Sequence, residues 1–340
     1  MAQRAEADAP RPAPRQRPTV LYVMGAGRSG STILGVALGN CENVFFAGEL
    51  DRWLARSGVP RRCDPPLTRF WDVVRREMGG SAELAGAKTT YLERSSALLD
   101  LCKWPHRHRL RPRYRRASED LYRAISRAAG VSHIVDSSHY PLRARELQAL
   151  RGIDLYLLLL VRDPQGVVAS LGRDDVPERR FGAPVANLYL WLTNLLSVFV
   201  FLRHPQDRRL LVRYEDFLAN PEEVIRQILH RIDSSAPIPD LDSLYTGVPF
   251  HGNRLVRSAV VELKRSPVDP ASRSRLTAVL QRPWAFVYSR LGPAVEPSDS
   301  AAASRVRRAP APASRSCSHE GVAESSQPSS APRSPRRPQG

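Results

Sequence analysis

Lysine, cysteine and metal-binding motifs are scarce in this chain of 340 residues. Only three of its 51 Lys and Arg residues are lysines. Its four cysteines form no C-x-x-C pair and have no histidine in ligand register, so neither a zinc site nor a disulfide framework is predicted. No zinc-finger spacing and no aromatic pair typical of RNA-recognition domains is present, so no nucleic-acid partner is expected.

Long apolar runs are also rare. The arginines near the N-terminus are followed by no apolar run of the signal-peptide kind, so the protein is expected to be cytoplasmic. Residues 185–202 (VANLYLWLTNLLSVFVFL) are about as long as a minimal membrane span. They include Asn187, Thr193 and Asn194, and a strand and a helix pattern follow. We therefore expect a buried helix and no membrane span.

Positive charge dominates the composition, with a formal net charge of +17. Residues 1–18 and 297–340 consist mainly of Pro, Ala, Ser and Arg with little to bury, and are predicted to be disordered. Residues 19–296 suffice for one α/β domain. A basic domain attracts polyanionic ligands. Its densest run, 105–116 (PHRHRLRPRYRR), is either a solvated helix start or a surface that grips an acidic acceptor.

Strand and helix patterns alternate along this domain. The runs that read as strands are residues 20–24, 44–46, 133–135, 155–161 and 209–212. A charged, helical region is expected before the third of these, up to about residue 129. Strands followed by helices, with polar residues where each strand ends, predict an α/β fold: a P-loop-type three-layer α/β/α domain with a central parallel sheet.

A glycine-rich loop follows the first strand, in the stretch VLYVMGAGRSGSTIL. Gly25 and Gly30 hold the glycine positions of a Walker A loop and Thr32 holds its hydroxyl, but Ser31 stands where the lysine belongs. The cation is Arg28 instead. Such a loop presents N–H groups and a helix terminus to an anion. It suits a nucleotide ending in phosphate plus another anionic group better than ATP; the alternative is an ordinary Gly/Ser-rich turn.

Three more polar signatures follow later strands. They read DSSHYP (136–141), RDPQGVVAS (162–170) and RYED (213–216). The carboxyl ends of parallel strands lie on one edge of a sheet, so these segments and the glycine-rich loop are expected to meet in one crevice.

Taken in this order, the signatures resemble the sulfotransferase superfamily over about residues 19–260, with most similarity to its bacterial members and its tyrosylprotein branch. The resemblance implies transfer of a sulfuryl group from 3′-phosphoadenosine 5′-phosphosulfate (PAPS), used as co-substrate without a metal, to a hydroxyl or an amine. The implied acceptor is a small molecule, a glycan or a lipid.

The resemblance also implies roles for single residues. It assigns the 5′-phosphosulfate to the loop residues Arg28, Ser29, Gly30, Ser31 and Thr32. Arg162 and Ser170 match the pair that binds the 3′-phosphate, and Tyr214 matches a tyrosine near the adenine. The late segment HGNR, with Asn253 and Arg257, matches one that closes over the nucleotide, although Arg254 is an alternative contact.

For catalysis the resemblance implies Glu49 as the base that takes the acceptor's proton and Arg28 as the cation at the leaving oxygen. His139 stands where related sequences carry a lysine. As an imidazolium it would neutralise the leaving oxygen, so its charge near neutral pH depends on its surroundings. The alternatives are that Glu49 only stabilises a helix terminus and that His139 only caps a turn.

Two other functions fit parts of the sequence. A P-loop kinase-like phosphotransferase would use the same loop type with ATP and Mg²⁺, but the missing Walker lysine and the Arg162–Ser170 pair argue against it. A catalytically weakened protein that binds PAPS or its product is the other, because of His139.

Overall fold

The computed structural model describes residues 17–60, 65–79, 89–98, 100–172, 182–263 and 274–291. Contacts divide the chain into two units, Met1–Glu296 and Pro297–Gly340, and every described residue lies in the first. The segments predicted to be disordered, 1–18 and 297–340, lie outside the described residues except for positions 17 and 18.

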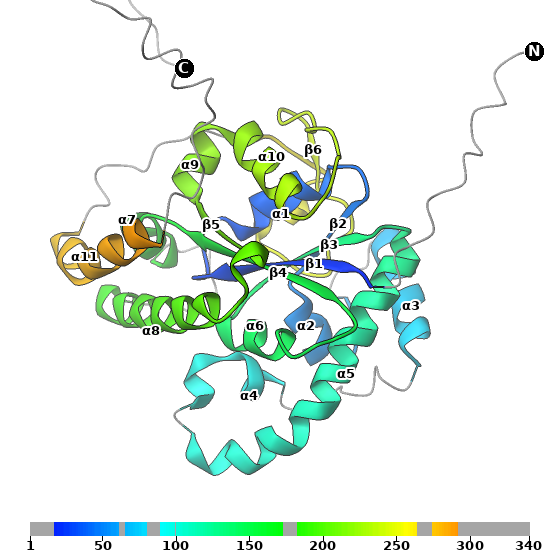
Figure 1. Ribbon diagram of the computed structural model, residues 1–340, viewed down its shortest axis with the longest axis horizontal. Helices are drawn as coiled ribbons and strands as arrows, with labels where there is room; N and C mark the ends of the chain where they lie inside the picture. Colours follow the sequence, from blue (N-terminus) through cyan, green and yellow to red (C-terminus); the bar gives the residue numbers. More distant parts are fainter. Residues whose placement is uncertain are drawn as a thin grey trace, which may run out of the picture. The chain divides into compact units, whose positions relative to one another are not determined.

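A five-stranded parallel sheet forms the centre of the first unit, in the order β2-β3-β1-β4-β5 (Figure 1). Its strands are β1 (Thr19–Gly25), β2 (Val44–Gly48), β3 (His133–His139), β4 (Asp154–Val161) and β5 (Arg209–Arg213). Thr19 in β1 aligns with His133 in β3 on one side and with Asp154 in β4 on the other. All five predicted strands are present, and the third is longer than expected because it continues into the DSSH segment.

Both faces of the sheet are buried, which explains the continuous apolar strands. In β1, Val20, Tyr22 and Met24 belong to one hydrophobic cluster. The alternate residues Leu21 and Val23 belong to a second cluster on the opposite face. None of the five is more than 2% exposed.

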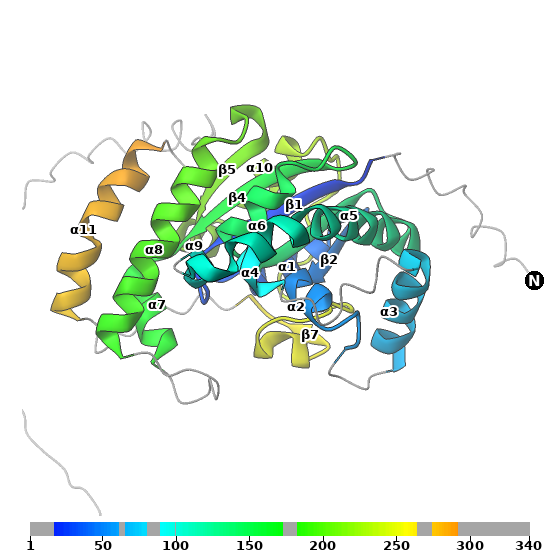
Figure 2. The same ribbon diagram turned by 90° about the horizontal axis from the view of Figure 1, so that it is seen from below.

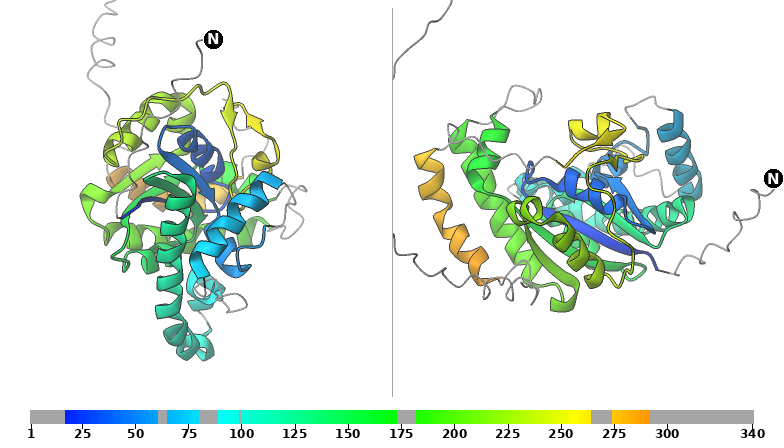
Figure 3. Two further views of the ribbon diagram at one scale, coloured as in Figure 1. Left: turned by 90° about the vertical axis from the view of Figure 1, so that its right-hand side faces the viewer. Right: turned by 90° about the horizontal axis from the view of Figure 1, so that it is seen from above.

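Helices cover each face and form the outer layers of a three-layer α/β/α domain (Figures 1 to 3). On the Leu21 face lie α1 (Ser31–Gly39), α9 (Tyr214–Ala219) and α10 (Pro221–Arg231). On the Tyr22 face lie α2 (Leu50–Ala55), α3 (Pro65–Met78), α5 (Trp104–Ala129), α6 (Pro141–Leu147) and α8 (Ala183–Leu202). The remaining elements are α4 (Thr90–Glu93), α7 (Pro164–Leu171), α11 (Arg275–Arg290) and the two-stranded sheet β6 (Leu244–Tyr245) and β7 (Val260–Val261).

The chain leaves neighbouring strands toward opposite faces. Strands β1 and β4 are adjacent, but α1, which follows β1, covers one face and α8, which comes after β4 and α7, covers the other. Such a switch opens a crevice at the carboxyl ends of the two strands. The glycine-rich loop and the RDPQG segment both lie at this edge.

The arginine-rich run 105–116 lies within α5, and part of it has a structural use. Arg111 and Arg115 donate to the two carboxylate oxygens of Glu146 on α6, at 2.9 and 2.8 Å. The carboxylate is buried, and the two cations compensate it. Part of the run therefore anchors α5 to α6.

The long apolar segment is a helix as expected, but only one of its faces is buried. Among the described residues α8 is the one helix long and apolar enough to cross a membrane by length and composition. It packs on α6, α7, α11, β1 and β4, and these contacts bury 44% of its most apolar stretch. The prediction of a buried helix was therefore wrong for its outer face.

A buried polar network supports the end of β3. Arg143 is fully buried and donates to Asp136 at 3.0 Å and to the Tyr114 hydroxyl at 2.6 Å. Tyr122 donates to Asp136 at 2.6 Å, and Tyr114 donates to Glu93 at 2.6 Å. Removing one partner from such a network leaves an unpaired charge inside the protein.

We expect Arg143→Ala to lower the free energy of unfolding by about 3 kcal/mol or more, because Asp136 loses its buried counter-charge. Urea denaturation followed by circular dichroism measures the change. The control is Arg127→Ala, which removes an exposed ion pair with Glu77 and is expected to cost less than about 1 kcal/mol. Equal losses of free energy of unfolding in the two variants would show that the buried network stabilises the protein no more than an exposed ion pair does.

Candidate functional site

The glycine-rich loop joins β1 to α1 in a conformation that needs its glycines. Gly25 has φ 153° and Gly30 has φ 98°, and a Cβ at either position would lie 2.3 Å from Leu160 O or from the Tyr214 ring. Arg28 also has a positive φ, 72°. Helix α1 starts at Ser31 with no side-chain cap and no acidic residue in its first turn. Its N-terminal amides therefore offer an anion site.

Arg28 is hydrogen-bonded to two distant segments, 162–170 and the late HGNR segment. Its Nε donates to Ser170 Oγ at 3.0 Å, and its NH1 donates to Asn253 Oδ1 at 3.1 Å. Its carbonyl oxygen accepts from Arg162 NH1 at 2.9 Å. The structure thus brings together four of the residues that the sequence pattern selected.

Arg162 and Ser29 carry buried polar atoms without a partner. Within the described residues, neither Arg162 Nε nor Ser29 Oγ makes a hydrogen bond. The Arg162 guanidinium lies over the Tyr214 ring, 4.7 Å from its centroid. Unpaired buried donors are costly, and a bound anion is one way of satisfying them. The residues of this loop therefore fit a phosphorylated ligand.

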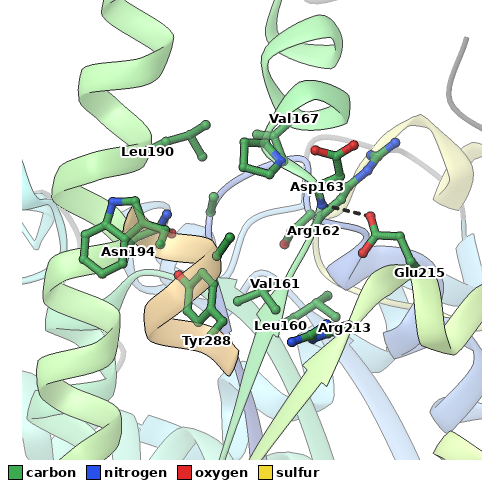
Figure 4. A pocket seen from close by; sticks show the side chains of 15 residues that line it. Leu160, Val161, Arg162, Asp163, Val167, Leu190, Asn194, Arg213, Glu215 and Tyr288 are labelled. Atoms are coloured by element: carbon green, nitrogen blue, oxygen red, sulfur yellow. Dashed lines mark hydrogen bonds between the residues drawn. The ribbon is translucent and has the colours of Figure 1, made fainter. Parts of the chain in front are cut away.

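A cavity of about 210 Å³ lies beside the loop, between the ends of β4 and β5 and helices α7, α8 and α11 (Figure 4). Asp163 and Glu215 lie on its rim, and the Asp163 amide donates to Glu215 Oε1 at 2.9 Å. This bond ties the RDPQG segment to the RYED segment. The two signatures therefore form one wall.

A second cavity of about 490 Å³ lies next to Tyr214, at the start of α1. Its lining is mostly apolar and consists of Ile33, Tyr214, Leu218, Leu255, Val260, Val261, Glu262 and Leu263. A flat, largely apolar group such as a nucleobase suits this lining. Tyr214 touches both this cavity and the stacked Arg162.

The late HGNR segment closes onto the loop through Asn253. The backbone N–H of Asn253 donates to Thr32 Oγ1 at 3.4 Å, and the side-chain Oδ1 of Asn253 accepts from Arg28. Arg254 and Arg257 belong to the short 3₁₀ turn Arg254–Arg257 and are exposed. The contact of this segment with Arg28 is thus made by the amide side chain.

Glu49 lies at the end of β2, and its carboxylate contacts the side chains of His251 and Arg52 instead of capping α2. It occupies the N-cap position of α2 but makes no side-chain capping bond. Its Oε2 lies 3.1 Å from His251 Nδ1 and 3.5 Å from Arg52 Nε. Burial alone would raise the pKa of Glu49, but the bond with His251 and the charges of His139, His251 and Arg52 lower it to about 2. The group is a carboxylate at neutral pH.

His139 lies at the end of β3 with φ 55° and reaches toward the glycine-rich loop. Its Nε2 is 3.9 Å from where a Cβ on Gly27 would stand. Burial lowers the pKa of His139, and the nearby carboxylate of Glu49 opposes this only in part. The imidazole is therefore largely neutral at pH 7 and acts better as a proton acceptor than as a fixed cation.

The buried network holds these two groups in position. Asp136 Oδ1 accepts from the Ser138 amide at 2.9 Å, and the Ser138 hydroxyl accepts from the Asp51 amide at 3.1 Å. His139 follows Ser138, and Glu49 lies two residues before Asp51. The network thus fixes the backbone on both sides of the Glu49–His139 pair.

Sequence reasoning missed three residues of the site. His251 belongs to the HGNR segment, but no sequence pattern indicated that it pairs with Glu49, 202 residues away. Tyr189 accepts the Gly27 amide at 2.9 Å from within the apolar run of α8. Arg52 adds positive charge beside Glu49. Of the three, only Tyr189 left a signal in the sequence, as an aromatic residue in the apolar run after the RDPQG segment. This signal is weak.

Comparison with known proteins identifies the family. A scan against protein families matches residues 19–237 to the Sulfotransferase family. The chain therefore belongs to the sulfotransferase family. A search of curated protein sequences finds no match. Among the described residues, no group of three or more His, Cys, Asp or Glu side chains is placed to hold a metal ion.

A solved sulfotransferase domain has a similar fold. The sulfotransferase domain from the curacin biosynthetic pathway gives a TM-score of 0.50 at 17% identity, over 79% of this chain and 98% of that one. The sulfotransferase domain from the Synechococcus PCC 7002 olefin synthase gives 0.46 at 20% identity, over 80% and 97%. At this identity, the first of these comparisons shows likeness of fold alone.

The Glu49 environment predicts an acid-dependent stability. Its folded pKa of about 2 lies below the ordinary value of 4.5, so its contribution is present above pH 4.5 and is lost as the pH falls toward 2. Glu49→Gln is therefore expected to lower the free energy of unfolding above pH 4.5, by at most about 3 kcal/mol. The difference from the unsubstituted protein should shrink below pH 4.5.

Urea denaturation at several pH values measures this difference, with the exposed Glu42→Gln as the matched control. A pH-independent difference between Glu49→Gln and the unsubstituted protein would show that the charge of Glu49 is not what the surroundings stabilise.

Proposed function

We propose that the protein transfers a sulfuryl group from PAPS to a hydroxyl or an amine of an acceptor. The observation that carries this proposal is the meeting of Arg28, Arg162, Ser170 and Asn253 around a phosphate loop without a Walker lysine. PAPS carries anionic groups at two ends of one nucleoside. Arg28 and Arg162 offer positive charges to such groups, Ser170 offers a hydroxyl and Asn253 an amide. Membership of the sulfotransferase family supports the same reading.

The donor, when bound, supplies a sulfuryl group activated by its anhydride bond to the 5′-phosphate. The amides at the start of α1 and the Arg28 guanidinium would bind this phosphosulfate end. Arg162 and Ser170 would bind the 3′-phosphate, since a guanidinium fork suits phosphate oxygens. The apolar cavity beside Tyr214 would take the adenine.

Glu49 and His139 would handle the proton of the acceptor. A base works best when its pKa lies near the operating pH. Glu49, with a pKa of about 2, is a weak proton acceptor at neutral pH, whereas the neutral imidazole of His139 is a better one. In this proposal His139 takes the proton, and Glu49 stabilises the imidazolium that forms. Glu49 as the base is the alternative assignment.

Binding of the product nucleotide, adenosine 3′,5′-bisphosphate, tests the donor site by isothermal titration calorimetry. Arg162→Ala is expected to weaken affinity about thirtyfold or more, because a phosphate charge loses its partner, about 2 kcal/mol. Arg226→Ala, an exposed arginine paired with Glu223, is the control. Unchanged affinity in Arg162→Ala, or equal affinity for ATP with Mg²⁺, would contradict the assignment and favour a kinase-like function.

Transfer from radiolabelled PAPS to a cell extract tests the chemistry. His139→Asn is expected to lower kcat by 10²-fold or more with nucleotide affinity unchanged, because the proton acceptor is lost. Glu49→Gln should lower it less. The reverse ranking would make Glu49 the base. Tight nucleotide binding without any transfer by the unsubstituted protein would instead favour a non-catalytic nucleotide-binding protein.

A further inference from the structure

Helix α8 exposes more apolar side chains than an ordinary surface helix does. Its buried side is mixed and holds the polar Asn187, Thr193, Asn194 and Ser197 beside the apolar Ala186, Leu190, Val200 and Phe201. Its outer side is apolar along the whole helix and consists of Val185, Leu188, Leu192, Leu195, Phe199 and Leu202. Leu188 is 61% exposed and Leu195 is 52% exposed. A helix that faces water normally carries polar and charged residues on its outer side.

Helix α11 extends this apolar surface. It lies alongside α8 in the views of Figures 2 and 3. Trp191 of α8 donates to the Leu280 carbonyl at 2.8 Å and packs edge-on against Trp284 at 5.0 Å. The outward apolar residues of α11 are Leu276, Val279, Leu280 and Phe286. We call the outward apolar residues of both helices the α8–α11 surface.

Polar contacts inside the pair hold the two helices together. Asn187 Nδ2 donates to Thr277 Oγ1 at 3.1 Å, and Gln281 Nε2 donates to Asn187 Oδ1 at 2.9 Å. Polar groups between helices, with apolar side chains outside, are the arrangement found where helices meet an apolar medium. The pair is thus built to be covered on its outer side.

The rim of the surface is positively charged. Helix α8 has no charged residue, and the charged residues of α11 are three arginines, Arg275, Arg282 and Arg290. Arg203, just after α8, lies over the Phe199 ring at 3.8 Å. In the part of this turn that the structure describes, the acidic Asp207 lies beside Arg208. An apolar surface with a basic rim complements an anionic lipid surface.

We propose that the α8–α11 surface docks on an anionic lipid bilayer, with both helices lying in the interfacial plane and neither crossing it. A second copy of this chain is a poorer occupant, because a symmetric contact brings the arginine rims of both copies together. The chain's own residues 297–340 are also a poor cover. They hold seven arginines and, of the large aliphatic and aromatic types, only two valines.

Cosedimentation of the full-length protein with vesicles tests the proposal. The protein should bind vesicles of phosphatidylcholine and phosphatidylserine, and bind pure phosphatidylcholine much more weakly. Raising the salt concentration should weaken binding to the anionic vesicles. Removing Arg282 and Arg290 should weaken it about fivefold for each arginine.

Leu188→Gln combined with Leu195→Gln should abolish vesicle binding, whereas Tyr245→Gln should not. Tyr245 is 67% exposed on β6, away from α8 and α11. Thermal unfolding by circular dichroism checks that all variants fold. Binding that survives the leucine substitutions would overturn the proposal. A dimer in analytical ultracentrifugation that the same substitutions dissociate would also overturn it and identify a second copy as the occupant.

Discussion

The site depends on the backbone of a single arginine. Arg28 adopts a left-handed conformation that costs a non-glycine residue of the order of 1 kcal/mol. Three hydrogen bonds hold it there, to Ser170, Asn253 and Arg162. These partners come from two separate segments, 162–170 and the HGNR segment, so the conformation of the loop depends on both. The same contacts hold the Arg162 guanidinium next to the loop.

The order of the strands divides the site into two halves. Strands β1, β4 and β5 lie side by side, and the residues after them are the cations and hydroxyls suited to phosphate groups. Strands β2 and β3 lie on the other side of β1, where Gly48 aligns with Asp136. This register brings Glu49 and His139 close together. The loop after β1 lies between the two halves.

Much of this arrangement could be read from the sequence, because apolar runs and polar strand ends are local patterns. The parallel sheet, the phosphate loop and the convergence of Arg28 with Arg162 follow from them. The pairing of Glu49 with His251 could not be read, since it joins residues far apart in the chain. Nor could the neutral state of His139, which depends on burial. In α8 the apolar run indicated burial, but the few polar residues determine which side faces inward.

Helix α8 also touches the phosphate loop, since the Tyr189 hydroxyl accepts the Gly27 amide. One helix thus carries a hydroxyl that contacts the glycine-rich loop and leucines that lie on the outer surface. A ligand that accepts the hydrogen bond of the Gly27 amide competes with Tyr189 and breaks this contact between α8 and the loop. If a ligand at the loop changes how strongly α8 binds a partner on its outer side, then that partner changes the affinity of the loop for its ligand by the same factor.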